Sequence, residues 1–438
     1  MIIDETFYEK LEEDFQVIYP NQSGATYTSL LNYSDEGNKF RQRWYRYKEG
    51  YSVDLIKMLI KNYNKNENGV ILDPFLGSGT TLMAANELNL KGIGFEVNPF
   101  SYFLSKCKLE NYSHIERQEF KLATQQILID AHKISDTMIL PLPKLSIADK
   151  VFDTNIQNYV LSIKYSIDNY TGSQKVKNLL LLGWLSSIES ISKYRKAGNG
   201  LKKKTSKKNI INNNLQVSNI LRENYENIYN DLVGENIKFE SKIINDSSLN
   251  LSQYISNNSI SGVIFSPPYA NSFDYTEIYK LELWFGSFVE EYSDLKKLRN
   301  ISLRSHLNGL SSIEKETEYT SIPDLDILIK ELKTKELWNK KIPLMLQQYF
   351  SEMFELLDKI WMSLEINGFC TIVVGNSAYG GIIFPTDLLI AKYAKYIGFT
   401  VDKIEVDRYI ITSSQQYHIT LNTKKYLRES VICLVKSK

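Results

Sequence analysis

Two short segments of this sequence carry residues whose types and spacing are suited to ligand binding and chemistry. Residues 73–81 (DPFLGSGTT) follow the apolar run 70–72, and residues 266–269 (SPPY) follow the apolar run 262–265. The first segment places a Gly-x-Gly turn between an expected strand and an expected helix. Because glycine has no side chain, backbone N–H groups and the helix N-terminus of such a turn can approach a ligand.

The glycine turn by itself is compatible with several nucleotide sites and with a simple structural turn. No Lys-Ser/Thr pair follows Gly79, which argues against a phosphate-binding P-loop. Asp73, at the end of the first strand, could hold an ammonium group, and Glu96, at the end of the next expected strand (92–96), has the position of an acid that binds ribose hydroxyls. The alternative is that Asp73 caps the turn and Glu96 is a solvated strand end.

The segment Ser266-Pro267-Pro268-Tyr269 is suited to accepting hydrogen bonds. Proline has no N–H group, so the loop offers carbonyl oxygens without competing backbone donors. An amine conjugated to a base ring is a poor nucleophile, and hydrogen bonds to the Ser266 oxygen and a proline carbonyl would draw its lone pair out of conjugation. Tyr269 would stack on the ring, which contributes about 1 to 3 kcal/mol. A stiff structural turn is the alternative for this segment alone.

The two segments need a scaffold of alternating strands and helices, and the sequence predicts an α/β fold. Residues 70–96 have the pattern of a βαβ unit with a parallel pair of strands. Two further expected strands, 242–246 and 262–266, also end in polar residues at the carboxyl edge, where open α/β sheets bind ligands. The alternation then continues with a helix at 343–364, a strand at 369–374, a helix at 386–396 and strands at 401–406 and 430–435.

Segment 193–208 has eight basic and no acidic residues, with two glycines between them. Such a run, taken alone, is typical of a solvated, mobile loop, and phosphate contact is the alternative. Its basic residues are Lys193, Arg195, Lys196, Lys202, Lys203, Lys204, Lys207 and Lys208.

The 438-residue chain is 43% hydrophobic and 24% charged, as is usual for a folded globular protein, and its net charge of +1 neither favours nor excludes nucleic acid. The acidic N-terminal residues do not have the pattern of a secretory signal, and no apolar stretch has the length of a membrane span. We therefore expect a cytoplasmic protein without a membrane partner. Cys107, Cys370 and Cys433 are far apart, which predicts reduced structural thiols, and we expect no metal site.

Considered together, the two segments indicate a function far more specifically than either one does alone. The chain resembles the amino-methylating DNA methyltransferases that use S-adenosylmethionine, over roughly residues 45–110 and 240–436. The resemblance implies a catalytic tetrapeptide at Ser266, Pro267, Pro268 and Tyr269. It also implies that Glu96 binds the cofactor ribose, that Asp246 lies near its adenine, and that the other cofactor-binding residues are Tyr51, Ser52, Asp73, Phe75, Gly77, Gly79 and Thr80.

The resemblance further implies a Rossmann-like, seven-stranded sheet with six parallel strands and the last one antiparallel. It implies base flipping, because an amine inside a stacked duplex cannot reach the methyl donor. In this family a tetrapeptide that begins with serine is associated mainly with cytosine N4, and one that begins with Asp or Asn with adenine N6. Ser266 therefore favours cytosine N4, and adenine N6 stays open. Methylation of cytosine C5 needs a thiolate, and the chain has no Pro-Cys pair to supply one.

Two insertions interrupt the expected fold, and in this context the basic segment favours phosphate contact. We expect the methyltransferase domain in three parts: an N-terminal segment with the cofactor-binding half at 1–110, the catalytic half at 237–285 and the rest of the domain at 343–438. The first insertion, at 111–236, is mostly helical and is the candidate DNA-binding region. The second insertion, at 286–342, is the candidate target-recognition region.

The expected partners are double-stranded DNA and a cognate restriction endonuclease. Two other functions stay open at this point: methylation of a guanine N2 amine in RNA, and a catalytically silent module that binds nucleic acid. The sequence does not determine the target sequence or the oligomeric state.

Overall fold

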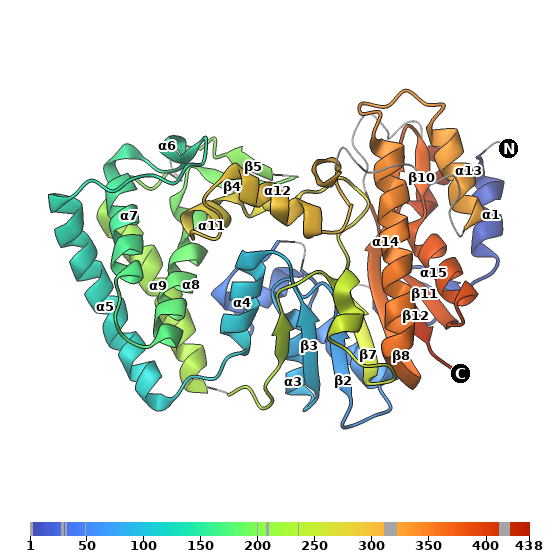
Figure 1. Cartoon of the computed structure of the whole chain (residues 1–438), viewed down its shortest axis with the longest axis horizontal. Coiled ribbons are helices and arrows are strands. Elements are labelled where there is room, and N and C mark those ends of the chain that lie inside the picture. The colour runs from blue at the N-terminus through green and yellow to red at the C-terminus, as the bar shows by residue number, and fades with distance from the viewer. Residues whose placement is uncertain are drawn as a thin grey trace.

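The computed structural model describes residues 3–27, 30, 33–48, 50–198, 200–206, 210–234, 236–310, 322–410 and 421–438. Over these residues the chain forms a central sheet with helices on both faces (Figure 1). A helical bundle stands beside one end of the sheet, and the C-terminal strands and the longest C-terminal helix lie at the other end.

In the described part of the chain, the central sheet has eight strands in the order β1-β11-β12-β8-β7-β2-β3-β6. Seven of them run in one direction and β12 is antiparallel to its neighbours, so the sheet contains the predicted six parallel strands and one antiparallel strand, with one strand more than predicted. The additional strand, β1, pairs in parallel with β11, and its two residues are too few to leave a periodic pattern in the sequence. The bounds are β1 (Val17–Ile18), β2 (Val70–Asp73), β3 (Lys91–Phe95), β6 (Lys242–Ile244), β7 (Ile260–Phe265), β8 (Leu364–Gly375), β11 (Thr400–Tyr409) and β12 (Arg428–Val435).

Alternate residues of the central strands face opposite layers of helices, as the two-residue period of a strand requires. Ile71 and Ile264 pack in the layer that contains α2 and α3, whereas Leu72 and Val263 pack in the layer that contains α14. The predicted amphipathic helix at 343–364 is present as α14, with Pro343 in its first turn. The bounds in these layers are α1 (Glu5–Glu12), α2 (Val53–Tyr63), α3 (Thr80–Glu87), α4 (Pro99–Leu109), α14 (Ile342–Ser363) and α15 (Thr386–Tyr396).

The chain between β3 and β6 contains a bundle of helices that surround a hydrophobic core of their own. This core is continuous with the buried faces of α4 and α11 (Lys280–Phe285), so the bundle is joined to the sheet through α4. The bundle consists of α5 (His114–Thr137), α6 (Ala148–Val151), α7 (Thr154–Asp168), α8 (Gln174–Ile191) and α9 (Asn214–Gly234).

The basic segment is not a loop without structure. Its strands β4 (Tyr194–Ala197) and β5 (Gly200–Lys203) form an antiparallel hairpin, which corrects the expectation of a mobile loop. Gly198 at the turn has a φ of +57°, a left-handed conformation that tight hairpin turns use and that glycine adopts without strain. Lys207 and Lys208 lie outside the described residues.

The second insertion follows β7 and crosses the carboxyl edge of the sheet, where α12 lies above the strand ends (Figure 1). Residues 311–321 of this insertion are outside the described part of the chain. The bounds of the remaining elements are α10 (Tyr275–Ile278), α12 (Tyr292–Ile301), α13 (Pro323–Leu332), β9 (Ser377–Tyr379) and β10 (Ile382–Phe384).

A buried charge network connects the N-terminal helix to the C-terminal strands. Arg428, at the start of β12, donates from Nε to Asp387 of α15 at 2.8 Å, and its Nη1 lies 3.2 Å from Glu12 of α1. Asn376 and Ser430 also donate to Asp387. The side chains of Arg428 and Asp387 are 0% exposed, so removal of either one leaves the other as a buried charge with fewer partners.

We therefore expect Arg428→Met to lower the free energy of unfolding by about 3 kcal/mol, because it leaves the Asp387 carboxylate uncompensated. Urea denaturation followed by tryptophan fluorescence measures this. The matched control is Lys395→Met, which removes a cation whose pair with Asp14, at 3.8 Å, is half exposed. That change should cost at most about 1 kcal/mol. Equal losses for the two variants would contradict a stabilising role for the buried network.

Candidate active site

The glycine turn has the predicted place between β2 and α3. Gly77 and Gly79 have φ values of +53° and +86°, in the left-handed region that favours glycine, and α3 begins at Thr80. Space is limited as well, because a Cβ at Gly77 would lie 3.3 Å from the ring of Tyr47. Both conformation and close approach therefore require glycine here.

Glu96 follows β3, and the glycine turn holds its carboxylate. Its Oε2 accepts the N–H of Gly77 and its Oε1 accepts the N–H of Asn98, each at 2.7 Å. Burial raises the pKa of Glu96 to about 7, although both hydrogen bonds favour the ionised form. A carboxylate has about four lone-pair sites, so capacity remains for hydroxyl donors from a ligand.

Asp73 lies behind the cavity wall and does not line the cavity. Its Oδ1 accepts the N–H of Phe75 at 2.9 Å, and its Oδ2 accepts the hydroxyls of Tyr51 at 3.0 Å and Thr81 at 2.5 Å. Burial raises its pKa to about 6. In this arrangement Asp73 fixes Tyr51, which does line the cavity, and contact with an ammonium group stays a prediction.

Ser52 is the N-cap of α2 and accepts the N–H of Leu55 at 3.1 Å.

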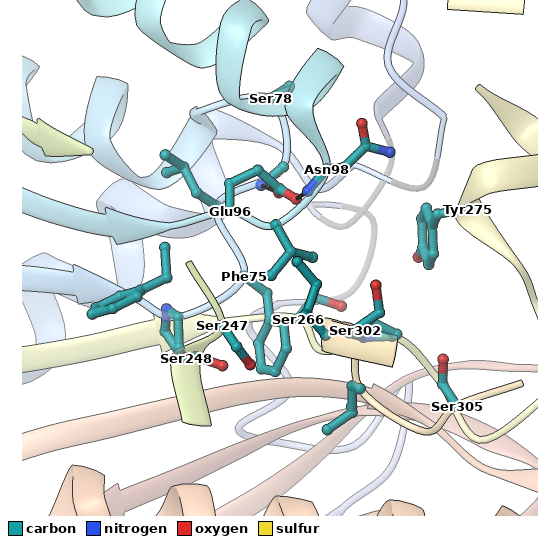
Figure 2. A pocket seen from close by; sticks show the side chains of 18 of the residues that line it. Phe75, Ser78, Glu96, Asn98, Ser247, Ser248, Ser266, Tyr275, Ser302 and Ser305 are labelled. Carbon is teal, nitrogen blue, oxygen red and sulfur yellow. Dashed lines mark hydrogen bonds between the residues drawn. The ribbon is translucent and has the colours of Figure 1, made fainter. Parts of the chain in front are cut away.

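A cavity of about 1030 Å³, including its open mouth, lies at the carboxyl ends of β2, β3 and β7. Its lining includes the predicted residues Tyr51, Phe75, Gly77, Thr80, Glu96, Asp246, Ser266 and Pro268. Across the cavity from Glu96 lie Ser302 and Ser305 of the second insertion (Figure 2). This insertion therefore forms a wall of the cavity, in addition to any contact with a target.

Asp246 follows β6 and is part of the lining of this cavity. Its Oδ1 accepts the N–H of Ser247 at 2.7 Å, and its Oδ2 accepts the hydroxyl of Tyr254 at 2.8 Å. The pKa of Asp246 is lowered, since these hydrogen bonds outweigh the opposing effect of burial. It is therefore an ionised acceptor at neutral pH.

A second cavity, of about 800 Å³, meets the first at Ser266. Tyr51 and Tyr275 also line both cavities. The walls of the second cavity are aromatic and charged: Lys48, Tyr269, Phe273, Tyr275, Arg408 and Glu429. Of the tetrapeptide, Ser266 faces both cavities, Pro268 the first and Tyr269 the second, whereas Pro267 is in neither lining.

Tyr269 is held between two strands of the sheet. Its ring lies against the backbone of Gly375 in β8, where an added Cβ would be 2.8 Å from two ring carbons. Its hydroxyl donates to Oε1 of Glu429 in β12. Burial and the Glu429 carboxylate raise the pKa of Tyr269 well above its ordinary value, so the hydroxyl keeps its proton.

The basic hairpin divides its charged residues between the interior and the surface. Lys196 is buried, with Nζ 2.5 Å from the carboxylate of Glu282 and above the ring of Tyr45, so we do not retain it as a phosphate contact. Lys204 donates to carbonyls at the end of α8, and Lys193 lies 3.5 Å from Asp153. The exposed residues are Arg195, Lys202 and Lys203.

The turn of the hairpin reaches the second cavity. Gly198 is part of the cavity lining, and its carbonyl accepts from Nζ of Lys48 at 2.6 Å. Arg195 and Lys202 are paired across the two strands, which places them on the same face of the hairpin. The exposed cations therefore lie on an element that ends beside Tyr269.

Several residues that line the two cavities carry no sequence pattern that would identify them as site residues rather than ordinary strand or loop residues. Arg408 and Glu429 are far from both motifs, and only the pairing of β8, β11 and β12 brings them to Tyr269. Phe273 and Tyr275 follow the tetrapeptide within six residues, and this closeness in the sequence could have identified them as candidate site residues. Ser302 and Ser305 depend on the path of the insertion.

The three cysteines are buried and form no disulfide. Burial raises the pKa of each thiol, which disfavours the thiolate that attack on a base ring requires. Within the described ranges, no helix is both long and apolar enough to cross a membrane.

Comparisons with known proteins give a consistent result. The DNA methylase family of N6/N4 methyltransferases matches residues 5–106. The type II methyltransferase M.BsoBI of Geobacillus stearothermophilus is 29% identical over 90% of this chain and 86% of its own length. M.AvaI of Nostoc sp. is 28% identical over 86% of this chain and 83% of its own length. M.HindIII of Haemophilus influenzae is 46% identical over 66 residues, which are 14% of this chain and 21% of its own.

The family match includes the glycine turn and Glu96, and two of these relatives align with most of the chain. The fold, the two joined cavities and these matches agree: the chain is similar to the N6/N4 DNA methylase family over residues 5–106 and to type II DNA methyltransferases over most of its length.

Proposed function

We propose that this protein transfers a methyl group from S-adenosylmethionine to an exocyclic amine of a flipped DNA base at a specific site, most favourably to cytosine N4. The single observation that carries the proposal is the junction of the two cavities at Ser266. One cavity has the acids and the glycine turn of a nucleoside site, and the other has aromatic walls suited to a base. The relatives named above are type II methyltransferases, which supports a role as the modification enzyme beside a restriction endonuclease.

The chemistry of the first cavity fits the cofactor. Glu96 would accept from the ribose hydroxyls, and Asp246 would accept from the adenine amine. Phe75 and the glycine turn would contact the adenosyl group, and Tyr51, tied to Asp73, would lie over the methionine end. When bound, S-adenosylmethionine supplies an electrophilic methyl group.

The second cavity supports recognition of a flipped base. Tyr269 offers a fixed ring for stacking, and Phe273 and Tyr275 offer further aromatic surface, with ring centres 4.9 Å apart. Ser266 and the adjacent proline carbonyl would accept the two N–H groups of the amine. Ser266 is a neutral acceptor, which is the family's usual choice for cytosine N4, and adenine N6 is the alternative outcome.

The first test uses labelled S-adenosylmethionine and duplex DNA, with mass spectrometry of the digested nucleosides. We expect N4-methylcytosine, and N6-methyladenine would support the alternative base. Ser266→Ala and Tyr269→Ala should each lower the rate of methyl transfer at least about 100-fold, because they remove an amine acceptor and the stacking ring. Calorimetry should still detect cofactor binding by both variants, and full activity of both would overturn the proposal.

A second prediction concerns the pH dependence of cofactor binding. The ionised form of Glu96 accepts from ribose hydroxyls, and its pKa in the free protein is about 7. The carboxyl is therefore increasingly protonated as the pH falls through 7, and affinity for the cofactor should fall about tenfold between pH 8 and pH 6. Calorimetry across this interval measures it. Glu96→Gln should bind more weakly and lose the dependence, whereas the same slope in this variant would assign the titration to another group.

A third prediction concerns the hairpin. Replacement of Arg195, Lys202 and Lys203 by glutamine should weaken binding to duplex DNA and reduce the slope of log Kd against log salt by about two to three units, since each phosphate contact contributes about one. The matched control replaces Lys61, Lys91 and Lys242, which are exposed and outside both cavities and the hairpin. If both triple variants show the wild-type slope, the hairpin does not contact phosphates.

A further inference from the structure

Glu429 ends a chain of hydrogen bonds that begins at the serine of the tetrapeptide. Oγ of Ser266 donates to the hydroxyl oxygen of Tyr269 at 3.4 Å, and the Tyr269 hydroxyl donates to Oε1 of Glu429. The second oxygen, Oε2, accepts from Nε of Arg408 at 2.6 Å. The first of these bonds is long, as catalytic hydrogen bonds often are before substrate binds.

The position of Glu429 is set by the sheet. It is the second residue of β12, paired with Gly375 at the end of β8 and with Arg408 of β11. Its side chain is 8% exposed, and it lines the second cavity beside Tyr269. Because β12 runs opposite to its neighbours, its first residues lie at the carboxyl edge, beside the tetrapeptide.

A serine acceptor has a difficulty that a carboxylate does not have. Its hydroxyl is both a donor and an acceptor, and its proton rotates to suit its surroundings. A Ser266 proton aimed at the target amine would occupy the lone pair that must attack the methyl group. The hydroxyl helps the reaction only when its proton is directed elsewhere and its own lone pairs face the amine.

We propose that Glu429 is a positioning residue that sets the direction of this chain and so makes Ser266 a pure acceptor toward the target amine. A carboxylate only accepts, so Tyr269 must donate to Glu429. The Tyr269 oxygen is then free to accept the Ser266 proton, which leaves the lone pairs of Ser266 for the amine. This role rests on the proposed amine methylation and adds a residue that neither motif contains.

Arg408 makes the inference testable by an isosteric change. In Glu429→Gln, Arg408 is a pure donor and would hold the amide oxygen, which turns the amide nitrogen toward Tyr269. The amide would then donate to Tyr269, Tyr269 would donate to Ser266, and the Ser266 proton would face the amine. We expect kcat to fall about 10- to 100-fold, as for one misdirected hydrogen bond. The cofactor Kd and the KM for DNA should stay within about twofold.

Two double variants distinguish a role of Glu429 in setting the direction of the hydrogen bonds from a role in supporting the structure around Tyr269. Once the hydroxyl is removed in Tyr269→Phe, Glu429 has nothing to direct, so adding Glu429→Gln should cause no further loss of kcat. Adding Arg408→Met to Glu429→Gln frees the amide to rotate, and part of the lost kcat should return. A structural role would instead give additive losses in both cases.

Glu365→Gln is the matched control, because it makes the same change at the opposite end of β8, where Glu365 accepts from Asn66 at 3.1 Å. It should leave kcat within about twofold. Melting temperatures and cofactor calorimetry report on folding of every variant. If the wild type methylates DNA and Glu429→Gln is equally active, or if the losses add, the inference is wrong while the proposed function stands. If the wild type transfers no methyl group to a base amine, the proposed function fails and the inference with it.

Discussion

The direction of the sheet strands is the constraint on which the site depends. β2, β3, β6 and β7 are parallel, so Asp73, Glu96, Asp246 and Ser266 come to one edge although 193 residues separate the first from the last. The backbone N–H of Gly77 in the glycine turn then donates directly to Glu96. The antiparallel β12 brings its first residues to this same edge, which is why Glu429 can reach Tyr269. A reversed β12 would place the acid at the opposite edge.

Aromatic packing connects the basic hairpin to the cavity lined by Glu96 and the glycine turn. The buried Lys196 lies above the rings of Tyr45 and Tyr279, with Nζ 4.9 and 5.1 Å from their centres. Tyr279 stacks on Tyr47 with ring centres 5.0 Å apart, and Tyr47 in turn lies against Gly77. A cation that composition alone would assign to the phosphate-binding surface is therefore part of the support for the glycine turn.

The serine of the tetrapeptide has physical consequences for the residues around it. Aspartate would bring a negative acceptor, whereas serine brings a neutral one with a proton that must be directed. In this protein the negative charge stands one side chain further away, on Glu429, and acts through the Tyr269 hydroxyl. The tyrosine then has two functions, since its ring is suited to stacking on a base and its hydroxyl passes on the direction of the hydrogen bond.

The sequence by itself determined the α/β class, the succession of the main strands along the chain, the glycine turn and the tetrapeptide, because strand periodicity and turn chemistry are local properties. It did not separate Lys196 from Arg195, since adjacent residues of a strand face opposite sides and only packing decides which side is buried. It also left Asp73 as a candidate ligand, whereas the fold surrounds it with Tyr51, Thr81 and Phe75. Glu429 depended entirely on tertiary structure, because the pairing of distant strands is a long-range property that no local pattern contains.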